Sequence, residues 1–321
     1  VWPRLDAPTF ANLSGEVTKF EANRSAVDLL RKLAEQGRAP DPEERSALNR
    51  FTGWGGLPKA FNPDQGDIPW KKRAEGLVAF LGNDYDSARA SVNNAHYTSI
   101  DVIEGMWSAI ERIGFTGGRI LEPSAGSGYF LGAMPAEIAA NSSITAVEID
   151  SLSSRFLKTL YEPFGVRVIN RGFEKASLPK DFFDLVISNV PFGNYPVPET
   201  RHVPFRDFLI HDYFFARALE VVRPGGIVAF ITSAGTMDKC NTAVRSYLAD
   251  RARLLGSIRL PLQAFQSIAN TKVTTDIVFL QKLCAGISSN KDAWVDGATL
   301  PANEACLGNK RWEEMYANTW Y

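Results

Sequence analysis

The sequence contains few cysteines and no excess of charge of either sign. Its three cysteines (Cys240, Cys284 and Cys306) are too few and too scattered for a disulfide framework or a zinc site. The formal net charge of -1, from 35 basic and 36 acidic residues, excludes a polybasic tail protein and an acidic disordered one. Nucleic-acid binding remains open, because a basic groove can coexist with acidic surface elsewhere.

Long apolar runs are absent as well. No run approaches the roughly 20 residues of a membrane span, and the first residues lack the apolar core of a signal peptide. The chain also lacks an initiator Met, which suggests a processed chain or an excised fragment. We therefore expect an intracellular, cytoplasmic protein without a membrane partner. Its 321 residues, 45% of them hydrophobic, suffice for one large domain or for one domain plus a smaller appendage.

The first 95 residues have a helical pattern. Asp41-Pro42-Glu43-Glu44 is typical of a helix start, with a capping Asp and Pro in the first turn. The segment 51–58 has three glycines around Trp54, which predicts a tight loop. We interpret residues 1–95 as a helical N-terminal region with a Gly-rich loop. Its apolar spacing predicts helices over 25–36, 42–51 and 70–81.

Residues 96–284 alternate short apolar strands with helices. Strands are predicted over 119–122, 144–149, 167–169, 183–188, 227–232, 254–259 and 276–281. Helices are predicted over 101–113, 129–140 with a break at Pro135, 151–162, 208–222 and 243–251. This alternation predicts an α/β fold, a Rossmann-like doubly wound and mainly parallel seven-stranded sheet, with ligands beyond the carboxyl ends of the strands. The tail, 285–321, has little pattern, and we expect it to be irregular.

A glycine turn follows the first predicted strand, at Glu122-Pro123-Ser124-Ala125-Gly126-Ser127-Gly128. Glycine lets the backbone approach a ligand where a Cβ would collide. A dinucleotide fingerprint would need a third glycine where this chain has Leu131, so the turn favours a nucleoside without phosphates. Glu148 ends the next strand, 20 residues beyond Gly128, where a carboxylate can accept hydrogen bonds from both ribose hydroxyls. The turn alone could be structural, but turn and acid together predict a nucleoside site.

Two further segments carry weaker signals. Phe173 and Glu174 follow the third strand, where the ring could pack on an adenine and the acid could accept its amine. The alternative is a surface loop with one buried ring. Residues 94–99 precede a helix capped by Ser99 or Asp101. Hydroxyls and N–H groups at a helix entrance can hold a carboxylate, or they can simply cap the helix.

The most informative stretch, Asn189-Val190-Pro191-Phe192, ends the fourth predicted strand. The lone pair of adenine N6 is delocalised into the ring, so this amine is a poor nucleophile. The Asn189 amide oxygen and the carbonyl of Val190 or Pro191 could accept its two hydrogens and stabilise the positive charge that develops on nitrogen. Phe192 could stack on the base and fix its plane. This chemistry needs no metal, and the three histidines are not at ligand spacing: His96, His202 and His211.

Together these motifs resemble those of the S-adenosylmethionine-dependent N6-adenine DNA methyltransferases. The resemblance covers about residues 94–281, with the cofactor motif before the catalytic motif as in the γ-like group. Segments 258–261 and 275–279 also look like the late strands of type I modification subunits. The loop 51–57 looks like one that precedes such domains in large phage and plasmid proteins that fuse a methyltransferase to a helicase.

The resemblance implies a methyltransferase domain at 96–284, with S-adenosylmethionine as cofactor and DNA as partner. Other domains of a larger protein, such as a helicase, are further candidate partners. In the family the catalytic tetrad has Pro where this chain has Val190. The backbone carbonyl is kept by that change, but the rigidity of the proline ring is lost.

The resemblance also implies a role for each motif. Asn189, Val190, Pro191 and Phe192 would bind the target base. Tyr97 and Thr98 would contact the methionine moiety of the cofactor, Glu148 would hold the ribose, and Phe173 with Glu174 would read the adenine. The remaining cofactor contacts would come from Glu122, Pro123, Ser124, Ala125, Gly126, Gly128, Ile149 and Asn189.

We therefore expect site-specific methylation of the N6 amine of a flipped-out adenine in DNA. Alternatives are methylation of an RNA adenine or a protein glutamine, and an inactive DNA- or cofactor-binding module of a larger protein. Val190, and the lack of an evident target-recognition domain after Gln281, favour the inactive module. Phosphate contacts are expected from the loop after the catalytic turn or from 71–73, although either basic cluster could be a solvated face. The loop candidates are Tyr195, Arg201, His202 and Arg206.

Overall fold

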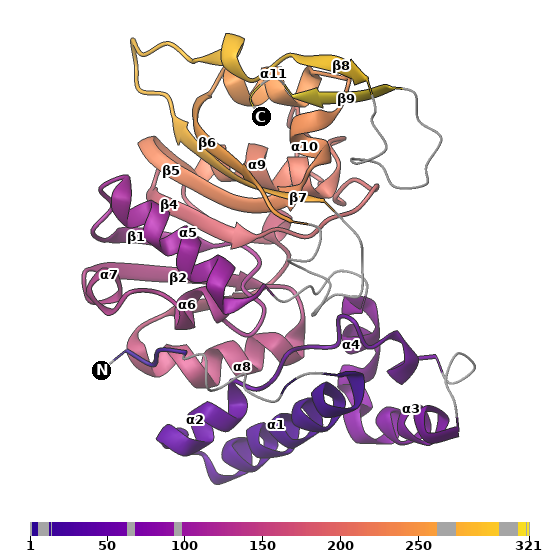
Figure 1. The fold of residues 1–321 in the computed structure, drawn as a ribbon. Helices are drawn as coiled ribbons and strands as arrows, with labels where there is room; N and C mark the ends of the chain where they lie inside the picture. The colour runs from indigo at the N-terminus through magenta and orange to yellow at the C-terminus, as the bar shows by residue number, and fades with distance from the viewer. Residues whose placement is uncertain are drawn as a thin grey trace. The chain divides into compact units, whose positions relative to one another are not determined.

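The computed structural model describes residues 2–5, 13, 15–62, 68–92, 98–261, 274–301, 314–318 and 320. Within these residues, seven strands form one sheet in the order β3-β2-β1-β4-β5-β7-β6 (Figure 1). β1 to β3 run parallel, whereas β7 runs antiparallel to both β5 and β6. The predicted α/β fold with a mainly parallel seven-stranded sheet is confirmed. In sheet order the strands are β3 (Arg167–Asn170), β2 (Ser142–Glu148), β1 (Gly118–Glu122), β4 (Phe183–Asn189), β5 (Val222–Ser233), β7 (Thr275–Lys282) and β6 (Ala252–Arg259).

The order of the strands reverses between β1 and β4, which are neighbours in the sheet although β2 and β3 separate them in sequence. In open α/β sheets this switch point is where ligands bind, outside the carboxyl ends of the strands. The chain divides into two compact units, and β4 is split between them after Val186. The first unit holds the described residues up to 177 together with 187–191, and the second holds the others.

The first unit contains β1 to β3 and most of the helices. α8 contacts β2 and β3, and it also contacts the N-terminal helices α1, α2 and α4. The helices are α1 (Glu16–Gln36), α2 (Pro42–Leu48), α3 (Ile68–Leu81), α4 (Tyr85–Ser91), α5 (Ile100–Arg112), α6 (Tyr129–Gly132), α7 (Ala136–Ala140) and α8 (Ser151–Tyr161). Short 3-10 turns add η2 (Pro58–Ala60), η4 (Gly82–Asp84), η5 (Glu162–Phe164) and η6 (Phe173–Lys175).

Local sequence signals explain several of these boundaries. Asp41 caps α2 by accepting from the backbone N–H of Glu44, and the Glu44 side chain accepts from the N–H of Asp41 in return. This reciprocal pair satisfies two N–H groups that the helix itself cannot pair. Pro135 separates α6 from α7, as the sequence predicts, because proline lacks the N–H that a continuous helix would use.

The Gly-rich loop folds around Trp54, which is buried within a cluster of aromatic rings from Phe20, Phe51 and Phe61. Asn23 of α1 holds the loop, because its side chain donates to the carbonyl of Gly53 (2.5 Å) and accepts from the N–H of Thr52 (2.8 Å). The predicted tight loop is confirmed.

The loop also joins the N-terminal helices to the sheet-bearing part of the first unit. The ring of Phe51 stacks on that of Phe156 in α8, with a centroid distance of 4.1 Å and an interplanar angle of 10°. Both rings are fully buried. The N-terminal helices therefore share a hydrophobic core with α8.

The second unit contains the start of β4, the strands β5 to β7, and the helices α9 (Ile210–Val221), α10 (Gly235–Asp238) and α11 (Ala243–Ala249). It also contains the 3-10 turn η8 (Lys291–Ala293). Within the described helices, none is both long and apolar enough to cross a membrane.

The expectation of an irregular tail over 285–321 is wrong. β8 (Gly297–Pro301) and β9 (Glu314–Asn318) pair antiparallel. The buried Asn318 side chain donates to the carbonyls of Met237 (3.1 Å) and Trp294 (2.7 Å). The strands are short and lie a dozen residues apart in sequence, so no two-residue turn marks the hairpin.

Candidate active site

The glycine turn after β1 passes directly over α8. Gly126 has a φ of +55° and Gly128 a φ of +96°, both in the left-handed region that favours glycine. A Cβ at Gly128 would lie 2.4 Å from the ring of Tyr161 in α8. Any other residue at this position would push the turn away from the helix. Gly128 therefore lets the turn lie close against α8.

Glu148, at the end of β2, is bound to this turn. One of its carboxylate oxygens accepts from the N–H of Gly126 (2.6 Å), and the other accepts from the N–H of Asp150 (2.7 Å). The sequence predicted that turn and acid serve one site, and the structure brings them into direct contact. Each carboxylate oxygen retains a second lone pair for a further donor.

Asn170, at the end of β3, was missed in the sequence analysis. Its side-chain amide donates to the carbonyls of Glu148 (2.8 Å) and Ile149 (3.2 Å). It thereby fixes the backbone that carries the acid. The available signal was its position, because a polar residue at the end of the third parallel strand lies at the same sheet edge as Glu148. Ile149 itself is 71% exposed, so an apolar side chain lies open beside the acid.

Burial perturbs both carboxyl groups at this edge. Burial raises the pKa of Glu148 to about 7, with a further increase from the negative charge of Asp150, against the lowering effect of the hydrogen bonds from backbone N–H groups. Burial also raises the pKa of Glu122 well above its ordinary value, and the charge of Glu148 adds to that rise. Within the described residues, one carboxyl oxygen of Glu122 is buried and has no hydrogen-bond partner. The edge therefore holds two buried acids, and one carboxyl oxygen of Glu122 lacks a hydrogen-bond partner among the described residues.

The Asn189 corner lies beside the glycine turn. The hydroxyl of Ser124 donates to the backbone carbonyl of Asn189 (3.1 Å), and the hydroxyl of Ser188 donates to the carbonyl of Ser124 (3.4 Å). The side-chain amide nitrogen of Asn189 donates to the hydroxyl of Thr98 (2.9 Å). Three segments that the sequence analysis singled out are thus joined by hydrogen bonds. The bond to Thr98 orients the amide, with its oxygen on the opposite side from Thr98.

The remaining predicted site residues differ in exposure. Pro123, Ala125 and Val190 are buried, whereas Pro191 and Phe192 are partly exposed. The ring of Phe173 is buried, so it offers little surface to a ligand, whereas Glu174 is half-buried and its carboxylate lies over Gly172. Tyr97 and His96 lie outside the described residues.

Arg201 is held by acidic side chains of its own chain. Its guanidinium forms ion pairs with Glu199 (2.6 Å) and Glu220 (3.1 Å), and Tyr213 also donates to Glu199 (2.6 Å). Burial alone would raise the pKa of Glu199, but the hydrogen bonds from Arg201 and Tyr213 outweigh it and lower that pKa to about 2. Arg201 is therefore a structural anchor of its loop, and its guanidinium is not presented to a phosphate. Tyr195, His202 and Arg206 are exposed.

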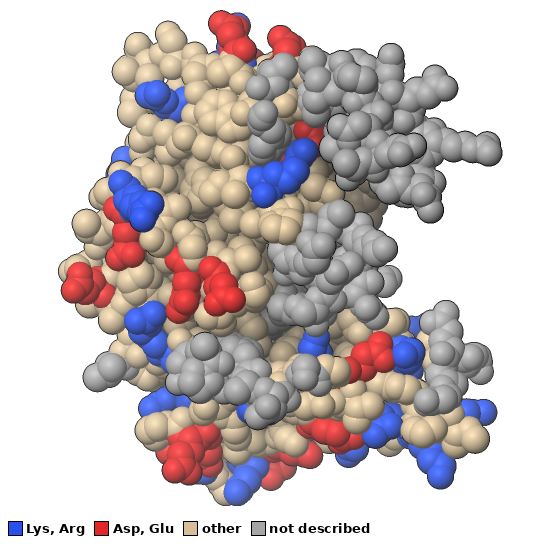
Figure 2. All heavy atoms as spheres, viewed as in Figure 1, with Lys and Arg blue, Asp and Glu red and all other residues tan. Residues whose placement is uncertain are grey.

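The basic cluster at 71–73 lies on α3 in a surface of mixed charge. Lys71 and Lys72 are exposed, and Arg73 pairs with Glu21 of α1 (3.3 Å). Over the N-terminal helices, basic and acidic side chains are interspersed on the face drawn in Figure 2. On that face these helices therefore present no basic surface of a single sign.

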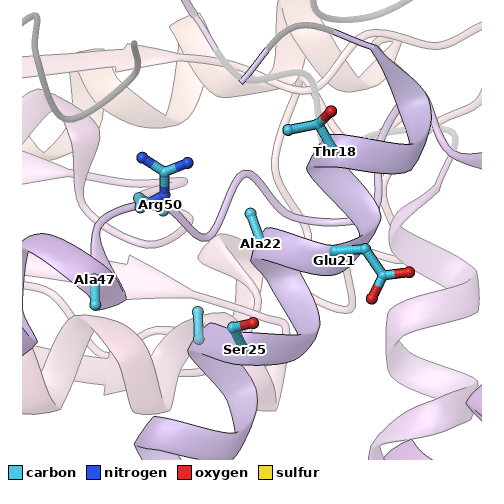
Figure 3. Close-up of a pocket in the computed structure, with 7 residues that line it drawn as sticks. Thr18, Glu21, Ala22, Ser25, Ala47 and Arg50 are labelled. Atoms are coloured by element: carbon cyan, nitrogen blue, oxygen red, sulfur yellow. The ribbon is translucent and has the colours of Figure 1, made fainter. Parts of the chain in front are cut away.

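A separate hollow of about 430 Å³ lies on the N-terminal helices (Figure 3). Thr18, Ala22 and Ser25 of α1 line one side, and Ala47 and Arg50 lie across from them. None of the predicted cofactor or catalytic residues lines it. Within the residues that the structure describes, no three His, Cys, Asp or Glu side chains are grouped to hold a metal ion.

Comparison with known families identifies this arrangement. The family model described as N-6 DNA Methylase matches residues 79–300, well over half of the chain. The chain belongs to the N-6 DNA methylase family. The matched segment includes the glycine turn, Glu148 and the Asn189 corner.

Individual relatives agree with this assignment. The chain is 28% identical over 303 residues to the "Defense against restriction protein B" of Escherichia phage P1, covering 94% of this chain but only 12% of that protein. A Listeria monocytogenes protein described as a class I S-adenosylmethionine-dependent methyltransferase superposes with a TM-score of 0.52 at 17% identity, over 84% of this chain and 91% of its own. A Vibrio vulnificus protein described as a modification subunit of a type I restriction enzyme superposes with a TM-score of 0.51 at 14% identity. The match covers 88% of this chain and 77% of that protein's chain. The two structures share the methyltransferase fold.

S-adenosylmethionine is the cofactor implied by this family and fold. The buried carboxyl oxygen of Glu122 and the buried hydroxyl of Ser127 have no hydrogen-bond partner within the described part of the chain. Buried polar atoms of this kind are normally satisfied, and a nucleoside with an amino-acid moiety carries the donors and acceptors to do so. The residues present at this edge fit the cofactor.

Proposed function

We propose that this chain methylates the N6 amine of adenine in DNA, using S-adenosylmethionine. The observation that carries the proposal is the set of hydrogen bonds among Ser124, Asn189 and Thr98, which place the catalytic corner beside the glycine turn. A base held at the corner would then lie next to a cofactor held at the turn. Membership of the N-6 DNA methylase family supports the choice of the amine and of DNA.

The cofactor site we propose is formed by residues of the first unit. Glu148 would accept hydrogen bonds from the two ribose hydroxyls. Glu122 would accept a hydrogen bond from a donor group of the amino-acid moiety. The exposed side chain of Ile149 would cover the adenine. Glu174 would accept a hydrogen bond from the adenine amine. The ring of Phe173 is buried, so it would anchor that loop and would not contact the adenine.

When bound, S-adenosylmethionine would supply an electrophilic methyl group and leave as a neutral thioether, and the methylated nitrogen would release one proton to water. The side-chain oxygen of Asn189 and the backbone carbonyl of Val190 would each accept a hydrogen bond from one N–H group of the target amine. These bonds localise the lone pair on nitrogen and stabilise the positive charge that develops there. Thr98 contributes by accepting a hydrogen bond from the Asn189 amide nitrogen, which leaves the amide oxygen on the opposite side for the base. The partly exposed ring of Phe192 would stack on the base.

The target adenine has to leave the duplex before the corner can bind its amine, at a cost of a few kcal/mol in pairing and stacking. We propose that the exposed residues after the catalytic corner, Tyr195, His202 and Arg206, contact the phosphates beside the extruded base. Such contacts position the strand and carry no sequence information themselves.

The test is methyl transfer from radiolabelled S-adenosylmethionine to DNA, with RNA and protein as parallel acceptors. Asn189→Ala should abolish transfer to DNA while cofactor affinity changes little, because the amide acts on the base. Asn141→Ala is the matched control, since Asn141 is exposed and precedes β2 at the amino end of the strands. Transfer to RNA or protein alone, or equal loss of transfer and cofactor binding in Asn189→Ala, would refute this assignment.

A second candidate is an inactive cofactor- or DNA-binding module. The observation that favours it is Val190, which replaces the family's proline and is buried, so its side chain is committed to packing. Cofactor binding without transfer to DNA, RNA or protein would support this candidate.

The biological setting we propose is modification of DNA in the cytoplasm as part of a larger protein. The phage relative is named for defence against restriction, and this chain spans 12% of its length. Methylated adenines could protect DNA from restriction. Neighbouring domains, such as a helicase, would then deliver the DNA to the site.

A further inference from the structure

The helix α4, in the N-terminal region, contacts the first turn of α8. The hydroxyl of Ser87 donates to a carboxylate oxygen of Asp150 (2.5 Å). The buried Asp84, just before α4, accepts from Arg155 and from the hydroxyl of Ser151 (3.5 Å). Both contacts reach the segment that directly follows the cofactor acid Glu148. α4 is therefore bound to the corner of the proposed ribose site.

Asp150 connects α4 to Glu148. Its backbone N–H donates to one carboxylate oxygen of Glu148 (2.7 Å), and its own carboxylate accepts from the N–H of Ser153 as the cap of α8 (2.8 Å). The other oxygen of the Asp150 carboxylate is the one that accepts from Ser87. Asp150 is buried, so a partner lost from its carboxylate is replaced by water only with difficulty.

The N-terminal region also reaches the glycine turn. The hydroxyl of Tyr129, the residue after Gly128, points to the carbonyls of Asn49 (3.3 Å) and Phe51 (3.2 Å). The same region thus touches the cofactor site at two corners, the turn and the acid. These two contacts come from different segments of the region and are independent of each other.

We propose that the N-terminal helices support the cofactor site from outside and that Ser87 is a positioning residue acting through Asp150 on Glu148. The inference rests on the proposed function, because it assigns the ribose to Glu148. A carboxylate can accept hydrogen bonds from both hydroxyls of a ribose only if its two oxygens face them together, so the position and orientation of the Glu148 side chain must be fixed. Ser87 holds the turn that sets this position, so cofactor affinity depends on a residue that does not touch the cofactor.

The experiment compares Ser87→Ala with Ser91→Ala in the full chain. Ser91 lies on the same helix and its hydroxyl donates only to the carbonyl of Ala88 in that helix (2.7 Å), which makes it a matched control. S-adenosylmethionine binding is measured by calorimetry at several pH values between about 6 and 8. We expect Ser87→Ala to weaken binding roughly tenfold, the size of one lost buried hydrogen bond. Ser91→Ala should bind like the unmodified chain.

A second readout separates positioning from general destabilisation. The charges that face Glu148 are those of Asp150 and Glu122. Losing the Ser87 hydroxyl leaves the charge of Asp150 less neutralised, so the midpoint of the pH dependence of binding should move upward. Asp150→Asn removes that charge and should move the midpoint downward. Ser87→Thr, which keeps a hydroxyl, should restore the original affinity and midpoint.

Two results would overturn the inference. Unchanged affinity in Ser87→Ala is one, and weaker binding with an unmoved midpoint is another, since a merely structural role predicts only the weakening. Failure of the unmodified chain to bind S-adenosylmethionine would refute the proposed function itself. Because the unmodified chain is measured first, the two kinds of failure are distinguishable.

Discussion

Glu148 combines two properties that conflict in most carboxylates. It is buried, which favours the protonated form, yet it accepts two backbone N–H groups, which favour the charged form. Burial prevails, and its pKa is raised to about 7. The acid that would bind the ribose is thus balanced near neutrality in the free protein, and small changes in its surroundings alter its charge.

This balance predicts a pH-dependent cofactor affinity. A charged carboxylate accepts from both ribose hydroxyls, whereas a protonated one has lost an acceptor, so affinity should rise as the pH increases from about 6 to 8. Glu148→Gln should bind the cofactor weakly and with little pH dependence. Titration calorimetry across this range checks both. A wild-type affinity that stays constant across the range would remove Glu148 from the ribose site.

The same group affects stability with the opposite sign. An unfolded glutamate titrates near pH 4.3, and the folded value is higher. The folded state therefore binds the proton more tightly. The stability contributed by Glu148 is fully present below the unfolded pKa and is lost as the pH rises through about 7. Conditions that favour cofactor binding at this acid therefore oppose its contribution to folding.

At the scale of elements, the segment between the Asn189 corner and α9 is a loop that is closed at its base. Pro196 and Leu209 form a β-bridge, and the N–H of Ile210 donates to the carbonyl of Tyr195 (2.9 Å). Inside, Glu199 has a nearly fully buried side chain paired with Arg201. A loop built in this manner presents its exposed residues from a fixed base.

Arg201→Ala should therefore destabilise the protein strongly. It leaves the buried carboxylate of Glu199 without its cation, which typically costs about 3–5 kcal/mol. The neighbouring exposed residue gives the control, since His202→Ala should change the free energy of unfolding by less than about 0.5 kcal/mol. Denaturant unfolding of the two variants checks this. Equal stabilities would mean that the ion pair is not a structural anchor, and Arg201 would again be a candidate phosphate contact.

The contrast between the strands and this loop explains what could be predicted from the sequence. Strand ends such as Glu148 and Asn189 follow apolar runs, so a local pattern is enough to place them at one edge of a parallel sheet. The partners of Arg201 are an acid two positions before it and an acid on the next helix, and no periodicity distinguishes such a pair from a solvated basic cluster.

The same reason accounts for the other differences. The contact of Ser87 with Asp150 joins segments that are distant in sequence, and β8 pairs with β9 across a dozen intervening residues. The contacts of the N-terminal helices with α8 are equally non-local. One sequence read by itself carries no signal for such contacts. The elements and the site motifs, by contrast, have local signatures.

At the scale of the whole molecule, α8 lies between the strands of the first unit and the N-terminal helices, since it contacts β2 and β3 as well as α1, α2 and α4. The buried stack of Phe51 on Phe156 and the bonds from Tyr129 to the Gly-rich loop belong to this contact. Removing the N-terminal helices would expose the apolar side chains of α8 that they bury, including the ring of Phe156. The N-terminal region should therefore be required for folding of the rest of the first unit.

We expect a fragment of residues 98–321 to unfold at least roughly 10 °C below the full chain, because it exposes the apolar surface of α8. Phe51→Ala in the full chain tests the same contact without truncation and should cost about 3–5 kcal/mol. Phe80→Ala is its control, because that half-exposed ring lies against the guanidinium groups of Arg24 and Arg31 rather than in the core. Thermal unfolding followed by circular dichroism measures all three. A fragment as stable as the full chain, together with a neutral Phe51→Ala, would show that the N-terminal helices are an independent appendage, and Ser87 could then have no role at the cofactor site.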